Sequence, residues 1–178
     1  KSFLDKNNIV FSDFEYAEDK LFNIQCYICG AKYAFIKEKG YIYRKNDDSI
    51  SFQYHKNSSE CWLGIANTVN QWLKERKENP DEYKDLIYYT IFFATFFDGK
   101  MEYEYSTGKI RTVINLLKRY ASYDLTKKYL KNPLRYTKKI PALSYKIMLG
   151  GFAFLMKCNM YLLLSLGIKL LVDCHIDE

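Results

Sequence analysis

The segment from Tyr83 to Phe97 constrains the fold of this chain more than any other, because it is apolar at most of its positions. A helix that is hydrophobic on every side has no face for solvent, so it must lie at the centre of a folded unit. Glycine follows the last turn of many helices, and Gly99 is the expected end of this one. The sequence therefore predicts a helical domain with this segment as its buried core.

Amphipathic patterns on both sides of the segment predict the helices that surround it. Residues 61–78 and 109–123 repeat apolar side chains at helical spacing, and 109–123 has the cleaner pattern. A further apolar stretch, 147–168, is long enough to span a bilayer, but Lys157 lies in its middle. Because a central lysine costs about 2.5–3.5 kcal/mol on insertion scales, we expect two buried helices interrupted near Gly150, and no membrane partner.

Four potential metal ligands, Cys26, Cys29, His55 and Cys61, form the pattern C-x2-C-x25-H-x5-C. Structural zinc is held tetrahedrally by four thiolate or imidazole ligands, and two cysteines separated by two residues can share one metal ion. Gly30 suits the tight turn that folds backbone N–H groups over such thiolates. Since three cysteines and one histidine fill all four positions, the pattern predicts structural Zn²⁺ rather than catalytic zinc.

The cysteines also admit plainer interpretations. The four residues of the pattern can be ordinary cysteines beside an exposed histidine, whereas a redox pair is disfavoured because no βαβ pattern surrounds it. Cys158 and Cys174 are expected in the core and His175 in the C-terminal tail. Five cysteines, an odd number in a chain of 178 residues, argue against a disulfide framework and predict an intracellular location, nucleus or cytoplasm.

Residues 32–44 alternate apolar and polar side chains in part, with Gly40 between the two alternating halves. Alternation around a glycine predicts a β-hairpin. The expected fold is therefore α+β and mainly α. It has a zinc-binding module with a hairpin at 1–61, followed by a helical domain at 62–178.

Aromatic residues precede both halves of the cysteine–histidine pattern, as Phe11-Ser-Asp-Phe14 before Cys26 and as Phe52 three residues before His55. With these residues, the region 9–61 resembles a BED-type zinc finger, the DNA-binding module of many transposase-derived proteins. The resemblance implies that the aromatic residues form a small core and that DNA is the partner. It also implies a set of zinc ligands, namely Cys26, Cys29, His55 and Cys61.

The second half of the pattern, His55-Lys-Asn-Ser-Ser-Glu-Cys61, is also similar to the BIR repeat of inhibitor-of-apoptosis proteins. That repeat places a C-x2-C pair before an H-x6-C pair. This resemblance implies a protein-interaction or inhibitor module, in which a zinc lobe docks a peptide or a partner protein. It supplies the alternative to a nucleic-acid function.

Charge is concentrated in residues 109–146, which hold eleven basic residues and one acidic residue, in a chain whose formal net charge is only +6. Cations neutralise phosphates, and the tyrosines interleaved with them can stack on bases. The plainer interpretation is a solvated face over a tyrosine core. The predicted nucleic-acid-binding residues are Lys109, Arg111, Lys118, Arg119, Lys127, Lys128, Lys131, Arg135, Lys138 and Lys139.

Catalytic signatures are missing from the sequence, which contains no G-x-x-x-x-G-K-[ST], G-x-G-x-x-G or G-x-S-x-G motif. An acidic cluster, Asp98, Glu102 and Glu104, suggests a metal-dependent nuclease as a remote hypothesis. The sequence favours a zinc-stabilised nucleic-acid-binding protein that contacts phosphates through residues 109–146, without enzymatic activity.

Overall fold

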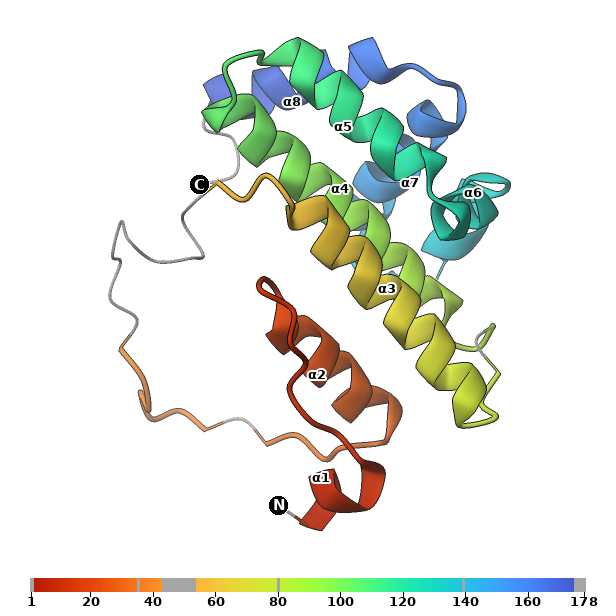
Figure 1. Ribbon diagram of the computed structural model, residues 1–178. Coiled ribbons are helices and arrows are strands. Elements are labelled where there is room, and N and C mark those ends of the chain that lie inside the picture. The colour runs from red at the N-terminus through yellow and green to blue at the C-terminus, as the bar shows by residue number, and fades with distance from the viewer. Residues whose placement is uncertain (1, 35, 43–53, 80, 139, 175–178) are drawn as a thin grey trace. The chain divides into compact units, whose positions relative to one another are not determined.

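The computed structural model describes residues 2–34, 36–42, 54–79, 81–138 and 140–174. The chain divides into two compact units, Lys1–His55 and Lys56–Glu178. In the described residues all regular structure is helical (Figure 1).

In its described residues, the first unit contains two helices, α1 (Ser2–Asn7) and α2 (Glu18–Ile28). Helix α2 buries Leu21, Gln25 and Cys26. Its end is set by Gly30, whose φ of 74° lies in the left-handed region that favours glycine. The backbone N–H groups of Gly30 and Ala31 donate to the last carbonyls of the helix at 3.0 Å, which is a Schellman motif.

The predicted β-hairpin is wrong, and with it the α+β fold class. Residues 32–34 and 36–42, the described part of that segment, form neither helix nor strand, and residues 43 and 44 lie outside the described residues. Tyr33, Ile36 and Tyr41 are all more than half exposed. A two-stranded hairpin is marginal in water unless one of its faces packs on something, and these side chains stay in solvent. The described chain is all-helical.

The second unit is built around α4 (Lys84–Tyr105), as the apolar run predicted. Four longer helices pack on it: α3 (Ser58–Glu75), α5 (Ile110–Ser122), α7 (Leu143–Lys157) and α8 (Tyr161–Asp173). Figure 1 shows α3 running along α4, and it shows α5 and α8 towards the C-terminal end of α4. Burial of Tyr88 is complete, and its hydroxyl donates to the carbonyl of Leu149 at 3.1 Å.

Two short helices connect α5 to α7. They are α6 (Asp124–Leu130) and the 3₁₀-helix η2 (Pro133–Thr137). Both contact α7, and α6 also contacts α5. The connection therefore forms part of the packed unit.

Two glycines of the second unit, Gly99 and Gly150, mark close approaches between helices and not helix ends. Helix α4 continues through Gly99 to Tyr105, so the expected end at Gly99 is wrong. A Cβ at this position would lie 2.7 Å from Cδ1 of Ile168 on α8, which explains why a glycine is needed. Gly150 similarly lies inside α7, where a Cβ would meet Leu134 of η2 at 3.3 Å.

The apolar stretch 147–168 forms two helices, α7 and α8, joined by a turn in which Asn159 has a φ of 57°. The pair of helices is thus confirmed, but the expected interruption near Gly150 is wrong, because Gly150 lies inside α7 and the turn between the helices is at residues 158–160. The pair is also only partly buried, since Ile147 and Leu162 are 66% and 58% exposed. Cys158 and Cys174 are exposed, so their predicted place in the core is wrong. No helix within the described ranges has both the length and the apolar character needed to cross a membrane.

Candidate nucleic-acid interface

Helix α5 turns its cations outward because its apolar residues recur at helical spacing. Val113, Leu116, Leu117 and Tyr120 are buried. The residues between them face solvent, and Arg111, Lys118 and Arg119 are exposed. This amphipathic helix confirms the pattern predicted for residues 109–123.

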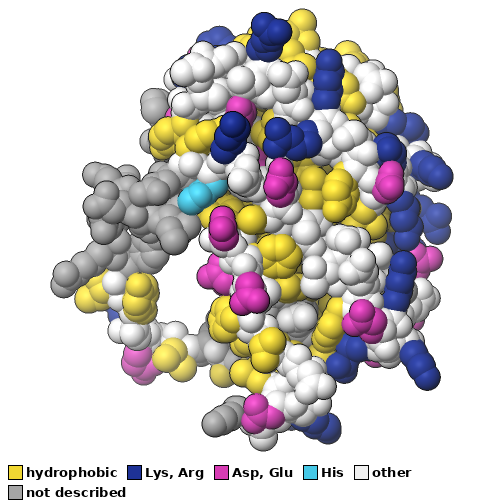
Figure 2. Space-filling view, in the orientation of Figure 1, with side chains coloured by type: hydrophobic (Ala, Val, Ile, Leu, Met, Phe, Trp, Pro, Cys, Tyr) yellow, Lys and Arg dark blue, Asp and Glu magenta, His cyan; other side chains and the backbone are white. Residues whose placement is uncertain are grey.

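The next two elements repeat this arrangement. Helix α6 buries Thr126, Tyr129 and Leu130, and η2 buries Pro133 and Thr137. Nine of the ten predicted binding residues are described, and each is exposed; Lys139 lies outside the described residues. The nine, which we call the basic face, are Lys109, Arg111, Lys118, Arg119, Lys127, Lys128, Lys131, Arg135 and Lys138. Figure 2 shows Lys and Arg side chains along the edge of the unit where α5 and α6 lie in Figure 1.

Several cations of the basic face already have partners. Lys127 forms an i,i+3 ion pair with Asp124 at 3.1 Å, and Lys128 lies 3.9 Å from Asp81. Lys109 donates to the carbonyl of Glu104 at 3.1 Å. These exposed contacts are each worth little, about 0–1 kcal/mol, so they compete only weakly with a phosphate.

Of the other six cations, Arg119 donates to the hydroxyl of Ser59. No ion pair or side-chain hydrogen bond holds the remaining five within the described part of the chain. They come from α5, from the C-terminal flank of α6, and from η2 and its C-terminal flank. The five are Arg111, Lys118, Lys131, Arg135 and Lys138. Such unneutralised cations on consecutive elements form a surface that favours a polyanion.

A notch at the η2 end of the basic face was not foreseen from the sequence. Arg135, Leu134, Phe154 and Lys157 line a cavity of about 420 Å³. Lys157 belongs to α7, and its amino group donates to the carbonyl of Lys131 at 2.7 Å. Since 26 residues separate the two lysines, only the tertiary structure brings Lys157 to the basic segment. Phe154 is 47% exposed, so the notch combines two cations with an accessible aromatic ring.

Two of the interleaved tyrosines are buried and so cannot stack on bases. Tyr120 and Tyr129 are fully buried, and Tyr129 packs edge-on against Tyr136 with ring centroids 4.9 Å apart. Tyr123 and Tyr145 are exposed. The core interpretation therefore holds for the two central tyrosines, because their rings fill the space beneath the cations.

A buried polar contact lies directly under α5. The hydroxyl of Tyr120 donates to Asp98 of α4, whose side chain is almost fully buried. Burial raises the pKa of Asp98 to about 6, against the hydrogen bonds from Tyr120 and Ser58, which lower it. Arg119 donates to the buried hydroxyl of Ser59 at 3.2 Å. Together these contacts tie α5 to α4 and to the first turn of α3.

The acidic cluster is not gathered into one metal site in the described residues. Asp98 is buried against Tyr120, whereas Glu104 is exposed on another side of α4. Within the described ranges, no group of three or more His, Cys, Asp or Glu side chains could hold a metal ion. The three carboxylates therefore lack the shared focus that metal-dependent hydrolysis needs.

The four predicted zinc ligands all belong to the described residues. Cys26 and Cys29 lie at the end of α2, three residues apart, a spacing that puts helical Cβ atoms about 5–6 Å apart. His55 lies in the same unit, with its ring 4.9 Å from that of Tyr16. Cys61 belongs to the first turns of α3 in the other unit. No metal site gathers them in the described residues, so zinc stays a prediction from spacing.

Comparisons with known proteins give no match to any family model, to any curated protein or to any solved structure. The BED-type and BIR-type resemblances therefore stay predictions from the sequence.

Proposed function

We propose that this protein binds nucleic acid through the basic face of its helical unit, with the phosphate backbone as the main contact. The observation that supports this most directly is the set of five exposed cations without a carboxylate partner on α5, on η2 and on the C-terminal flanks of α6 and η2. Release of counterions from phosphates is the main source of such affinity. The burial of Tyr120 and Tyr129 removes two rings from base stacking, so weak sequence preference is expected.

Within this proposal, the notch is the place for a base. Arg135 and Lys157 would hold a phosphate, and Phe154 would stack on the adjacent base. A stacked base is worth about 1–3 kcal/mol by alanine substitution, but only an unpaired base can reach the ring. Single strands are therefore expected to bind more tightly than duplexes. The comparison of Phe154→Leu with wild type on both substrates tests this step.

The decisive experiment measures the salt dependence of binding by fluorescence anisotropy, with a labelled mixed-sequence oligonucleotide as the probe. If about five phosphates are neutralised, the logarithm of the affinity falls with the logarithm of salt with a slope of roughly −4. The triple variant Lys118→Glu, Lys131→Glu, Arg135→Glu should flatten this slope and weaken binding by more than about a hundredfold.

A matched control separates this face from net charge. Lys74→Glu, Lys77→Glu, Lys84→Glu changes three lysines of the same unit that lie outside residues 109–146. Both triple variants lower the formal net charge from +6 to zero. Equal losses in the two variants would mean that binding follows overall charge, and an unchanged affinity in the first would refute the interface.

Zinc is proposed separately, as a structural ion held by Cys26, Cys29, His55 and Cys61. Its test is the metal content of the purified protein, expected at one zinc per chain. Removal of a ligand in Cys26→Ser should then lower both the zinc content and the melting temperature. If the purified protein contains no zinc but still binds nucleic acid, the proposed basic face stands and the proposed zinc site is refuted.

A further inference from the structure

The outer side of α7 carries a line of exposed apolar side chains. Leu143, Ile147 and Phe154 follow at i, i+4 and i+11, so they lie within about 40° of one another around the helix. Leu134 of η2 extends the line, because it would meet a Cβ at Gly150 at 3.3 Å and lines the notch together with Phe154. The four side chains, which we call the apolar ridge, are between 47% and 68% exposed.

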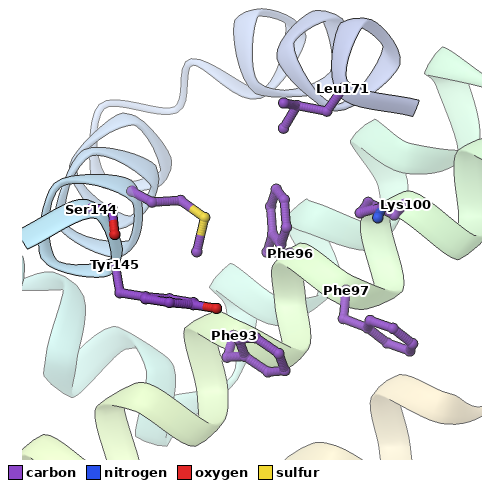
Figure 3. Close-up of a pocket in the computed structure, with 8 residues that line it drawn as sticks. Phe93, Phe96, Phe97, Lys100, Ser144, Tyr145 and Leu171 are labelled. Carbon is purple, nitrogen blue, oxygen red and sulfur yellow. The ribbon is translucent and has the colours of Figure 1, made fainter. Parts of the chain in front are cut away.

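The opposite side of α7 faces the core. Tyr145 lines a cavity between α4, α7 and α8, and Figure 3 shows its ring facing Phe93 of α4. Leu143 and Ile147 lie two residues before and two residues after Tyr145, a rotation of about 200° around the helix. The ridge therefore points away from α4, and the packing of this unit does not require its apolar side chains.

The surroundings of the ridge are basic. Arg135 and Lys157 line the notch beside it, and Lys157 donates to the carbonyl of Lys131 at 2.7 Å. The sequence from residue 125 to residue 172, which includes all of η2 and α7, contains nine lysines and arginines and no aspartate or glutamate. A partner that matches this face has an apolar interior beneath an anionic surface.

We propose that the apolar ridge docks on the surface of an anionic phospholipid bilayer, with Lys131, Arg135 and Lys157 at the lipid phosphates. Helices that lie in a membrane interface combine these features, because their apolar side chains enter the boundary of the acyl chains while lysine and arginine attract anionic lipids. Lys157, whose charge makes a membrane span costly, suits this contact, since its long side chain can keep the charge among the headgroups.

Charge and shape favour a bilayer over the other possible occupants. Two copies of the chain that met through the ridge would bring cations together, and no carboxylate in residues 125–172 could pair with them. A peptide lies in a groove, whereas Leu143 and Ile147 protrude, with exposed fractions of 68% and 66%.

The proposal goes beyond nucleic-acid binding and does not depend on it. The two proposals share Arg135 and Lys157, so they are separated through Leu143 and Ile147, aliphatic side chains that have no role in binding phosphates. Lipid binding is measured without nucleic acid, and either activity can therefore fail alone.

Flotation of the full chain with phospholipid vesicles tests the proposal. We expect binding to vesicles of phosphatidylcholine mixed with phosphatidylserine, and binding at least about tenfold weaker to phosphatidylcholine alone. The double variant Leu143→Ser, Ile147→Ser should weaken binding to the mixed vesicles by more than about tenfold and leave the oligonucleotide affinity unchanged. The matched control, Ile36→Ser, Ile42→Ser, changes two exposed isoleucines of the first unit and should leave vesicle binding unchanged.

A variant that adds affinity separates the contact from a folding defect. Ile147→Trp should bind the mixed vesicles about threefold more tightly, and its fluorescence should shift to shorter wavelength, because tryptophan prefers the membrane interface. No binding of the wild type to the mixed vesicles, equal losses in the two serine variants, or no fluorescence shift would overturn the proposal. A dimer in analytical ultracentrifugation that Leu143→Ser, Ile147→Ser dissociates would also overturn it, since a second copy would then cover the ridge.

Discussion

Helices α5 and α8 have the same length, thirteen residues, and both pack on α4, yet they present opposite chemistry to solvent. Helix α5 exposes arginine and lysine, among them Arg111 and Lys118. Helix α8 exposes a row of leucines that are each 46–59% accessible. These are Leu162, Leu163, Leu166 and Leu170.

The difference shows which side chains the fold needs. Each helix needs only one inner stripe to join the core, Val113, Leu117 and Tyr120 in α5 and Leu164 and Ile168 in α8. The outer residues are therefore set by something other than the packing of α4. A basic outer face suits a polyanion, whereas an outer row of leucines is an exposed apolar patch of the kind that marks an interaction surface.

The largest expected effect is a loss of stability when a side chain of an inner stripe is shortened, compared with the same change in an exposed row. Leu117→Ala removes a fully buried side chain of α5 and should lower the free energy of unfolding by about 2–5 kcal/mol. Leu166→Ala removes the same atoms from the exposed row of α8 and should cost less than about 1 kcal/mol. Urea unfolding of the two variants measures both. A large loss at Leu166 would mean that the row is covered in solution, and a concentration-dependent midpoint would then identify a second copy as the cover.

The second effect depends on pH and concerns the inner side of α5. The pKa of Asp98 is raised from 3.8 to about 6 by burial. Between about pH 4 and 6 the folded state keeps this proton and the unfolded state loses it, so the free energy of unfolding falls as pH rises through this window. The total fall is about 3 kcal/mol at 1.36 kcal/mol per pKa unit.

Two variants isolate this contribution. Asp98→Asn should remove it from the pH profile, as measured by urea unfolding at several pH values. Tyr120→Phe deletes a hydrogen bond that lowers the pKa of Asp98, so it should extend the window to higher pH. A wild-type profile that matches Asp98→Asn between pH 4 and 6 would show that the carboxyl is solvated in the native state.

The comparison of α5 with α8 also shows how far the sequence alone could lead. The apolar spacing of α5 is a local property, so its helix and its outward cations were predicted correctly. The same stripe included Tyr120, and its spacing from Val113 and Leu117 was the signal that its ring belongs to the core. Lys157 was missed because only tertiary contact brings it to Lys131.

The errors have a common origin. Alternation in residues 32–44 and a glycine at the end of an apolar run are local patterns, and they predicted a hairpin and a helix end. The first failed because those side chains found no surface to pack on. The second failed because Gly99 is selected by the approach of Ile168, which lies 69 residues further along the chain. A short stretch of sequence shows neither whether a packing surface is present nor which distant residue approaches a glycine.

The smallest expected effect compares Gly99, which lies on α4 against Ile168 of α8, with Gly167, which lies on the exposed side of α8. Gly99→Ala places a Cβ 2.7 Å from Ile168, which should cost about 1–3 kcal/mol as the helices move apart. Gly167→Ala points into open space and should stabilise the protein by up to about 1 kcal/mol through helix propensity. Because the cost of Gly99→Ala comes from one contact, it should be smaller in a protein that also carries Ile168→Ala. Thermal unfolding of the double variant and of both single variants measures this coupling. Additive losses in that cycle would place the strain elsewhere on α4, and the close approach of α8 would then not be the reason for the glycine.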